Sequence, residues 1–359
     1  MKVVLHIGSE KTGTTSIQHW AAANRAALAA RGILYPAAPG EADHGRIEPN
    51  HVGLALAVAE RARRPDLLGM LGLRDADALA RFLARLPERL AAEIAASGCA
   101  TPLLSNEHLS SRVKTAEETA ALRRLLEQAT AGREVSWQVV LYHRRQDEMI
   151  QSFHAMRVLH GHAEPFRLAA RAEDPRLDPR RLLDCYAAAF GEAAITVRPF
   201  DRRRMPGGDA VADLAALLGL DAAAPGFAPP PRANVSPGPA ALELLRLLNP
   251  HVPPTVDGRA NPARRPLLAA IRALPPEPRS LLAPRAELDR FLARYDAVNA
   301  EIARRWCGRP DGVLFDPPDP EEASLPVAGP LSAERAVALL APLLLRALDP
   351  KARPAGGER

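Results

Sequence analysis

Short β-branched apolar runs alternate with longer segments of helical periodicity in residues 1–221, and this alternation limits the fold more than any other feature of the sequence. Such a pattern builds a parallel sheet covered by helices. We therefore predict an α/β fold with a parallel sheet of about five strands flanked by helices. The predicted strands are Lys2–Ile7, Ile33–Tyr35, Pro102–Ser105, Trp137–His143 and Ala194–Arg198.

Helical patterns separate these strands and then continue to the end of the chain. The first is predicted at 15–31, because its apolar residues recur at helical spacing. Further helices are predicted at 75–96, 116–129, 147–159, 179–190, 209–218, 239–248, 262–274, 286–305 and 332–348. We predict an α/β core at 1–221, a mainly helical C-terminal part of the same domain at 222–349, and a disordered tail at 350–359.

Composition and charge indicate a folded chain with a small anionic ligand. Hydrophobic residues make up 47% and charged residues 25%, which is ordinary globular composition. The formal charge of +5 is spread thinly, which favours a small anion over a nucleic-acid track. No apolar window is long enough to span a bilayer, no signal peptide is visible, and the three cysteines form no CxxC pair. The expected compartment is the cytoplasm, and the oligomeric state stays open.

A loop between the first strand and the first helix carries the strongest chemical signal. Its sequence, Gly-Ser-Glu-Lys-Thr-Gly-Thr-Thr, spans Gly8–Thr15. A strand-loop-helix join of this kind aims unpaired backbone N–H groups and the positive end of a helix at an anion. The glycines have Walker A spacing, but Thr14 follows Gly13 and the lysine stands earlier, at Lys11. Lys11 would therefore lie beside the terminal bridging oxygen of a nucleotide, where leaving-group charge develops.

The run Lys11, Thr12, Gly13, Thr14 and Thr15 resembles the 5′-phosphosulfate loop of sulfotransferases that depend on 3′-phosphoadenosine 5′-phosphosulfate (PAPS), whose form is Lys-[Ser/Thr]-Gly-Thr-[Thr/Ser]. The resemblance implies a P-loop-like fold and PAPS as the co-substrate, with no metal expected. It implies that these five residues bind the nucleotide and that Lys11 also acts at the leaving group.

A second feature of that family is an arginine at the end of a later strand, with a serine eight residues on, and together they bind the 3′-phosphate. Arg144 and Ser152 have this spacing. Arginine suits the task because its planar fork matches phosphate oxygens. Arg145 adjoins Arg144, and either side chain can make the contact; the spacing favours Arg144.

The strand that ends at Ser105 is followed by two candidates for the group that accepts a proton from the acceptor. They are Glu107 and His108, and the carboxyl ends of parallel strands are where such sheets place chemistry. Family members use either residue type at this strand end, so both candidates stay open, with Glu107 preferred. We leave His51 out of the catalytic set, because a lone loop histidine is more often structural.

A last, less specific match is the segment from Arg232 to Ser236, which resembles the family's loop that closes over the nucleotide. Together the matches predict a sulfotransferase that transfers a sulfuryl group to a hydroxyl or amine on a small-molecule or glycan acceptor, with a carbohydrate or glycolipid as one candidate class. Two alternatives stay open: a P-loop kinase or triphosphatase that uses ATP with magnesium, and a nucleotide-binding module without catalysis.

Overall fold

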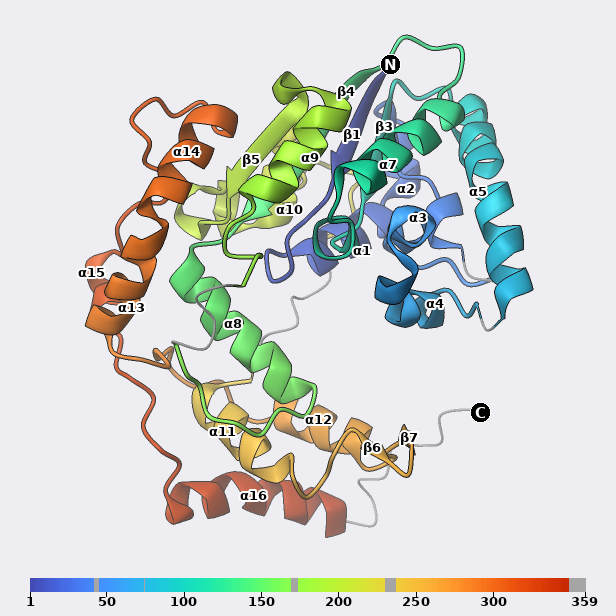
Figure 1. The fold of residues 1–359 in the computed structure, drawn as a ribbon. Helices are drawn as coiled ribbons and strands as arrows, with labels where there is room; N and C mark the ends of the chain where they lie inside the picture. The colour runs from blue at the N-terminus through green and yellow to red at the C-terminus, as the bar shows by residue number, and fades with distance from the viewer. Residues whose placement is uncertain (42–44, 74, 169–173, 230–236, 349–359) are drawn as a thin grey trace. The chain divides into compact units, whose positions relative to one another are not determined.

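A parallel five-stranded sheet lies at the centre of the N-terminal part of the computed structural model (Figure 1). The structure describes residues 1–41, 45–73, 75–168, 174–229 and 237–348. By internal contacts the chain divides into two compact units. The first holds 1–145, 174–233 and 295–316, and the second holds 146–173, 234–294 and 317–359. Contact units are not folding domains, so the predicted division at residue 221 stays a prediction.

The strand order in the sheet is β2-β3-β1-β4-β5, and every pairing is parallel. The strands are β1 Lys2–His6, β2 Ile33–Leu34, β3 Thr101–Ser105, β4 Ser136–His143 and β5 Ile195–Pro199. Val4 of β1 pairs with Leu103 on one side and with Gln138 on the other. Since β1 is central, its apolar side chains are buried on both faces. The predicted fold class and the five predicted strands are confirmed.

Helices of the first unit cover both faces of this sheet. On one face, α1 Thr14–Ala23, α2 Arg25–Ala29 and α10 Ala210–Leu217 share a hydrophobic cluster with the strands. The cluster joins Ile17, Trp20 and Leu214 to Val4, Leu103, Val140 and Tyr142. On the other face α5 Ala76–Ser97, α7 Ala116–Ala129 and α9 Arg180–Phe190 pack in succession, and α9 contacts β4. Figure 1 shows α7 and α9 on the viewer's side of the sheet.

Local sequence signals set the ends of these helices. The side chain of Asp75 caps α5 by accepting the N–H of Ala78 at 2.7 Å, and Gly98 ends the helix in a left-handed conformation. Thr115 and Glu118 form a reciprocal capping box at the start of α7. These caps explain why the predicted bounds of both helices hold.

The first predicted helix is wrong as a single element. The structure divides 15–31 into α1 and α2 at Asn24. The side chain of Asn24 accepts the N–H of Ala228 at 2.7 Å and donates to the Ala228 carbonyl at 3.1 Å. Because the break is stabilised by a segment some two hundred residues away along the chain, local periodicity does not reveal it.

The second unit is mainly helical. It contains α8 Gln146–Leu159, α11 Pro239–Leu248, α12 Arg264–Arg272, α13 Arg285–Leu292, α15 Pro320–Ala323 and α16 Ala333–Leu348. Apolar residues of α8, α11, α12 and α16 form its core. A short hairpin of β6 Thr255–Val256 and β7 Arg259–Ala260 was not predicted, since two-residue strands leave no periodicity to detect. The helix predicted at 286–305 is divided into α13, a turn at Ala293–Tyr295 and α14 Asp296–Trp306.

Three short helices of the first unit were also not predicted: α3 Val52–Val58, α4 Pro65–Met70 and α6 His108–Ser111. They lie in segments too short to show a clear period. Among the described residues, no helix combines the length and the apolar character that a membrane span requires. The predicted tail at 350–359 lies outside the described residues.

Candidate active site

The loop between β1 and α1 has the backbone geometry of an anion-binding turn. Gly8, Lys11 and Gly13 all have a positive φ, of 58°, 69° and 80°. A positive φ is rare for a residue other than glycine, so the conformation at Lys11 is notable. Helix α1 begins at Thr14, and no side chain caps its N-terminus. Its first N–H groups, which have no partner inside the helix, therefore open toward the loop.

Contacts within the loop and beneath it fix this shape. The hydroxyl of Thr12 donates to the Ser9 carbonyl at 2.6 Å and accepts the Ser9 N–H at 3.4 Å, so the Thr12 side chain braces the loop. A β-carbon at Gly13 would lie 3.0 Å from the β-carbon of Ala210 and 3.5 Å from the ring of Phe200. The loop thus rests directly on α10 and on the residue after β5.

Two cations meet at this loop. Nη1 of Arg144 donates to the carbonyl of Lys11 at 3.4 Å, and its guanidinium lies 5.6 Å from the centroid of the Phe200 ring. Burial lowers the pKa of Lys11, the charge of Arg144 lowers it further, and Glu10 raises it. Two neighbouring, partly desolvated cations favour a bound anion.

The two adjacent arginines occupy different surroundings. Arg144 is half-buried beside the loop, whereas Arg145 is only 4% exposed. Arg145 lies close enough to Asp201 for its charge to contribute to the lowered pKa of that carboxyl group, whose first cause is the hydrogen bond from Arg203. Arg144 is therefore the neighbour of the phosphate loop, and its contact with a 3′-phosphate stays a prediction.

Glu107 and His108 follow β3 at the same edge of the sheet as the loop, but their surroundings differ. A β-carbon at Gly8 would lie 3.1 Å from Cα of Glu107, so Glu107 packs against the loop. Its carboxylate accepts a hydrogen bond from Nε2 of Gln18 on α1 at 2.6 Å. His108 is 8% exposed and has Asp66 of α4 in its surroundings. The two side chains thus have different neighbours.

Several polar atoms at this strand end have no hydrogen-bond partner among the described residues. They are Nδ2 of Asn106 and both ring nitrogens of His108, and all three are buried. Buried polar atoms without a partner are rare, and these three offer hydrogen-bonding capacity to a polar ligand. The edge next to the loop is thus suited to a polar ligand.

Three predicted binding residues cannot be placed beside the loop. Ser152 lies on α8, in the second unit. Arg232 and Ser236 lie outside the described residues. Their nucleotide contacts stay predictions.

Sequence reasoning missed the residues that position this site from a distance. Gln18 binds Glu107, and Arg176, in the segment before α9, donates to Glu10 at 3.0 Å and to Asp174 at 2.6 Å. Gln18 lies four residues after Thr14, on the same face of α1, which is the one signal that points to it. No local signal marks Arg176, because its partner Glu10 lies far away in the sequence.

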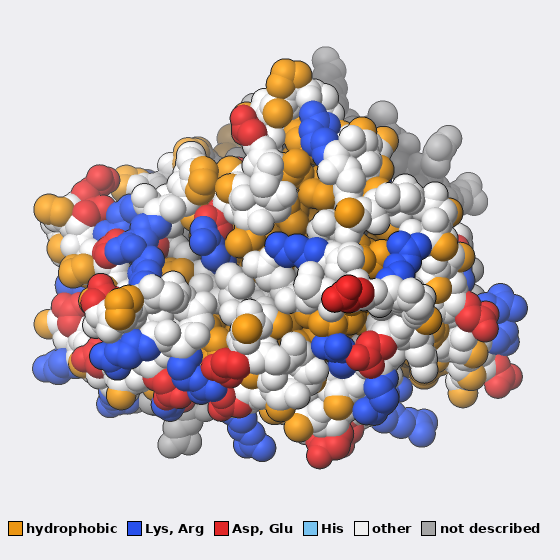
Figure 2. Space-filling view, turned by 90° about the horizontal axis from the view of Figure 1, so that it is seen from above, with side chains coloured by type: hydrophobic (Ala, Val, Ile, Leu, Met, Phe, Trp, Pro, Cys, Tyr) orange, Lys and Arg blue, Asp and Glu red, His pale blue; other side chains and the backbone are white. Residues whose placement is uncertain are grey.

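Charges of both signs are interspersed on the surface shown in Figure 2, where Lys and Arg side chains lie among Asp and Glu side chains. That face has no broad basic area. The prediction that the chain binds no nucleic acid is not tested by this and stays a prediction.

Comparisons with known proteins give little beyond this geometry. No family model matches the chain, and no curated protein matches it. Among solved structures, a sulfotransferase from Alicyclobacillus acidocaldarius aligns with 73% of this chain and 98% of its own chain, at 15% identity and a TM-score of 0.33. A likeness at that TM-score carries no argument about fold or function.

Proposed function

We propose that this chain is a sulfotransferase that moves the sulfuryl group of PAPS to a hydroxyl or amine acceptor. The observation that carries the proposal is the position of Lys11. It lies ahead of Gly13 in a left-handed conformation, half-buried and beside Arg144. In a triphosphatase loop the lysine follows the second glycine, where this chain has Thr14. A lysine moved into the loop suits a charge that develops on the bridging oxygen of a phosphosulfate.

Each residue of the loop has a role in this proposal. The backbone N–H groups from Lys11 to Thr15 and the hydroxyls of Thr14 and Thr15 hold the 5′-phosphate. The Thr12 hydroxyl is already bonded to Ser9, so Thr12 contributes its N–H group. Arg144 and Ser152 hold the 3′-phosphate, and Arg232 and Ser236 close over the nucleotide.

The chemical step needs a proton acceptor and a cation on opposite sides of the transferred group. Glu107 takes the proton of the acceptor hydroxyl as the new S–O bond forms. Lys11 stabilises the charge that the bridging oxygen gains as the old S–O bond breaks. Gln18 holds the carboxylate of Glu107 in place through the 2.6 Å hydrogen bond. His108 is the alternative base.

Calorimetric titration with 3′-phosphoadenosine 5′-phosphate (PAP), with and without magnesium, tests the proposal. We expect binding that does not need magnesium. Binding of ATP that requires magnesium, with no response to PAP, would instead identify a kinase or triphosphatase. PAP binding without transfer from PAPS to any of a broad panel of hydroxyl and amine acceptors would identify a non-catalytic module.

A further inference from the structure

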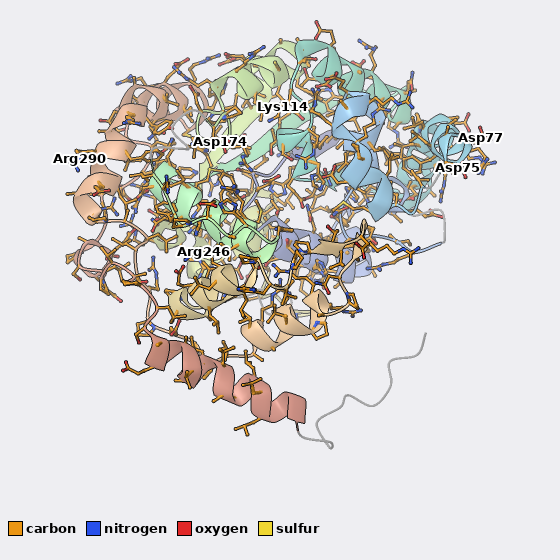
Figure 3. The ribbon with its side chains drawn as sticks, turned by 60° about the horizontal axis from the view of Figure 1, so that its bottom comes forward. Asp75, Asp77, Lys114, Asp174, Arg246 and Arg290 are labelled. Carbon is orange, nitrogen blue, oxygen red and sulfur yellow. The ribbon has the colours of Figure 1, made fainter. Side chains whose placement is uncertain are left out.

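A small cavity lies beside the phosphate loop, entirely within the first unit. Ser9 and Glu10 of the loop form one wall, and Leu141 and His143 of β4 form another. The remaining walls come from the segment after β3 and from the segment around the start of α9, namely Ser110, Ser111, Lys114, Pro175, Arg176, Asp178, Pro179, Arg181 and Leu182. Figure 3 labels Lys114 in the first of these segments and Asp174 just before the second.

The size of the cavity limits what it can hold. Its volume is about 80 Å³. Sites that enclose a whole small molecule measure roughly 300–1,000 Å³, whereas a single water needs on the order of 10–15 Å³. The space therefore suits one small group, such as a carboxylate or a sulfate, with a few waters.

The charges in the walls leave Lys114, a half-buried cation, without a counter-ion. Glu10 is bonded to Arg176 at 3.0 Å, and Asp178 is bonded to Arg180 at 2.7 Å. Nζ of Lys114 donates to the carbonyl of Ser110 at 3.1 Å. Both wall carboxylates are thus paired with arginines. Within the described ranges, no carboxylate lies within ion-pair distance of Nζ of Lys114, so its ammonium has no counter-ion.

The environment of Lys114 penalises its positive charge. Burial lowers the pKa of Lys114, and the nearby Arg176 lowers it further, while Glu10 raises it. The neighbouring His143 adds no charge of its own to the cavity near pH 7, because burial lowers its pKa to about 4. A half-buried cation without a counter-ion is stabilised by an anion that enters the cavity.

We propose that this cavity binds an acidic group of the acceptor, so that the preferred acceptors carry a carboxylate or a sulfate as well as the hydroxyl or amine that is modified. Ser9 and Glu10 directly precede Lys11, so an acid held here brings the rest of the acceptor to the loop. The acceptor role rests on the proposed function, whereas anion binding at Lys114 does not.

Anion binding can be tested directly at Lys114, because the chain has only four lysines: Lys2, Lys11, Lys114 and Lys351. Lysines methylated with carbon-13 give few NMR signals, and Lys114→Gln identifies the signal of Lys114. With PAP filling the nucleotide site, acetate should shift this signal in a saturable way and raise its titration midpoint. Acetamide, the neutral isostere, should not. Equal shifts with both probes, or none with acetate, would overturn the proposal.

Repeating the acetate titration with and without PAP shows whether the cavity is separate from the nucleotide site. If acetate shifts the Lys114 signal in the free protein and PAP abolishes that shift, the cavity belongs to the nucleotide site and the proposal fails. If PAP does not bind at all, the acetate titration still reports on the cavity. Failure of the proposed function and failure of this inference are therefore distinguishable.

The acceptor role is tested with a matched pair, glucuronic acid and glucuronamide. The wild type should favour the acid by about tenfold or more in kcat/KM, as expected for a charge-assisted contact. Lys114→Gln should bring this ratio close to one, Lys114→Arg should retain most of it, and Lys2→Gln, far from the cavity lining, should leave it unchanged. A wild type that uses the amide as well as the acid, or a Lys114→Gln variant with the original preference, would refute the acceptor role.

Discussion

Gly8 shows how closely the phosphate loop is packed against the candidate base. A β-carbon at this position would lie 2.7 Å from Cγ2 of Thr14 and 3.1 Å from Cα of Glu107, and φ is 58°. Gly8→Ala should therefore displace the loop and weaken PAP binding more than tenfold by calorimetry. Gly98→Ala is the matched control, since Gly98 has a φ of 65° but no atom within 4 Å of the added carbon. It should lower stability by about 1 kcal/mol and leave PAP affinity unchanged.

Lys11 is expected to act on the transition state more than on the bound nucleotide. Lys11→Ala should lower turnover by about 100- to 1,000-fold, the usual cost of removing a preorganised group that stabilises developing charge. The PAP dissociation constant should change far less, because the backbone N–H groups remain. Stopped assays of kcat together with calorimetry separate the two effects. A variant that loses affinity and turnover equally would contradict this role.

Arg144 is expected to distinguish nucleotides with a 3′-phosphate from those without one. Arg144→Ala should weaken PAPS binding by about 10- to 150-fold, equivalent to roughly 1.5–3 kcal/mol for a charge-assisted contact. Binding of adenosine 5′-phosphosulfate, which lacks the 3′-phosphate, should change much less. Equal affinity of the wild type for the two nucleotides would refute the 3′-phosphate assignment.

The two candidate bases can be separated by near-isosteric changes. Glu107→Gln keeps an acceptor for Gln18 but cannot take a proton, so turnover should fall by about 100- to 10,000-fold with the loop intact. His108→Asn should retain turnover within a few-fold, because Glu107 is the side chain that packs on the loop. The reverse pattern would assign the base to His108. PAP calorimetry on both variants confirms that the nucleotide site is preserved.

At the scale of single residues, the sequence predicted the contiguous parts of the site. Lys11 to Thr15 lie in one loop, so a local motif identifies them, and Arg144 was predicted from the family resemblance and its eight-residue spacing to Ser152. Gln18, Arg176 and Lys114 were not predicted, because their roles depend on contacts with segments distant in the sequence.

At the scale of elements, hydrogen bonds of the His51 ring link the start of α3 to β3. They also fix which ring nitrogen carries the proton. The Ser105 N–H donates to Nδ1 of His51 at 3.0 Å, so Nε2 carries the proton and donates to the Pro36 carbonyl at 2.9 Å. A proton added at Nδ1 would face the Ser105 N–H. Burial accordingly lowers the pKa of His51 to about 3. His51 thus has a structural role in linking these elements.

This arrangement predicts a pH dependence of stability. In the unfolded chain His51 titrates near 6.5, and its folded-state pKa is lower, so the unfolded state binds more protons in acid. The contribution of His51 to the free energy of unfolding is fully present above pH 6.5. It is lost as the pH falls toward 3, by up to about 1.4 kcal/mol per pH unit. The free energy of unfolding, measured in urea at a series of pH values from 7.5 to 4.5, should fall less steeply with falling pH for His51→Gln than for wild type. Identical slopes would refute this linkage.

Strands and capped helices were predictable because their signals are local. Short apolar runs marked all five strands, and the side chains of Asp75 and Thr115 cap two helices whose predicted bounds hold. The break at Asn24 was not predictable, since it depends on a hydrogen bond with Ala228. The turn at Ala293–Tyr295 that separates α13 from α14 was likewise missed, because the helical pattern continues across it.

At the scale of the whole molecule, the sequence predicted the class of fold but not the path of the chain between the two units. Composition and periodicity describe segments one at a time. Which segments pack together depends on long-range contacts, and here the chain alternates between the units instead of completing one before the other. The predicted division after residue 221, where convincing strand patterns end, stays a prediction, and the contacts group 295–316 with the unit that holds the sheet.

Helix α14, in that late segment, packs on β5 through buried residues that include Ile302, Ala303 and Trp306. Because β5 is the last strand at one side of the sheet, it has no further strand to cover it. During synthesis the ribosome adds on the order of 5–20 residues per second, so β5 emerges several seconds before its covering helix. Throughout that interval the apolar surface of β5 that α14 later covers is exposed to wrong pairing, and the completion of residues 295–316 covers it.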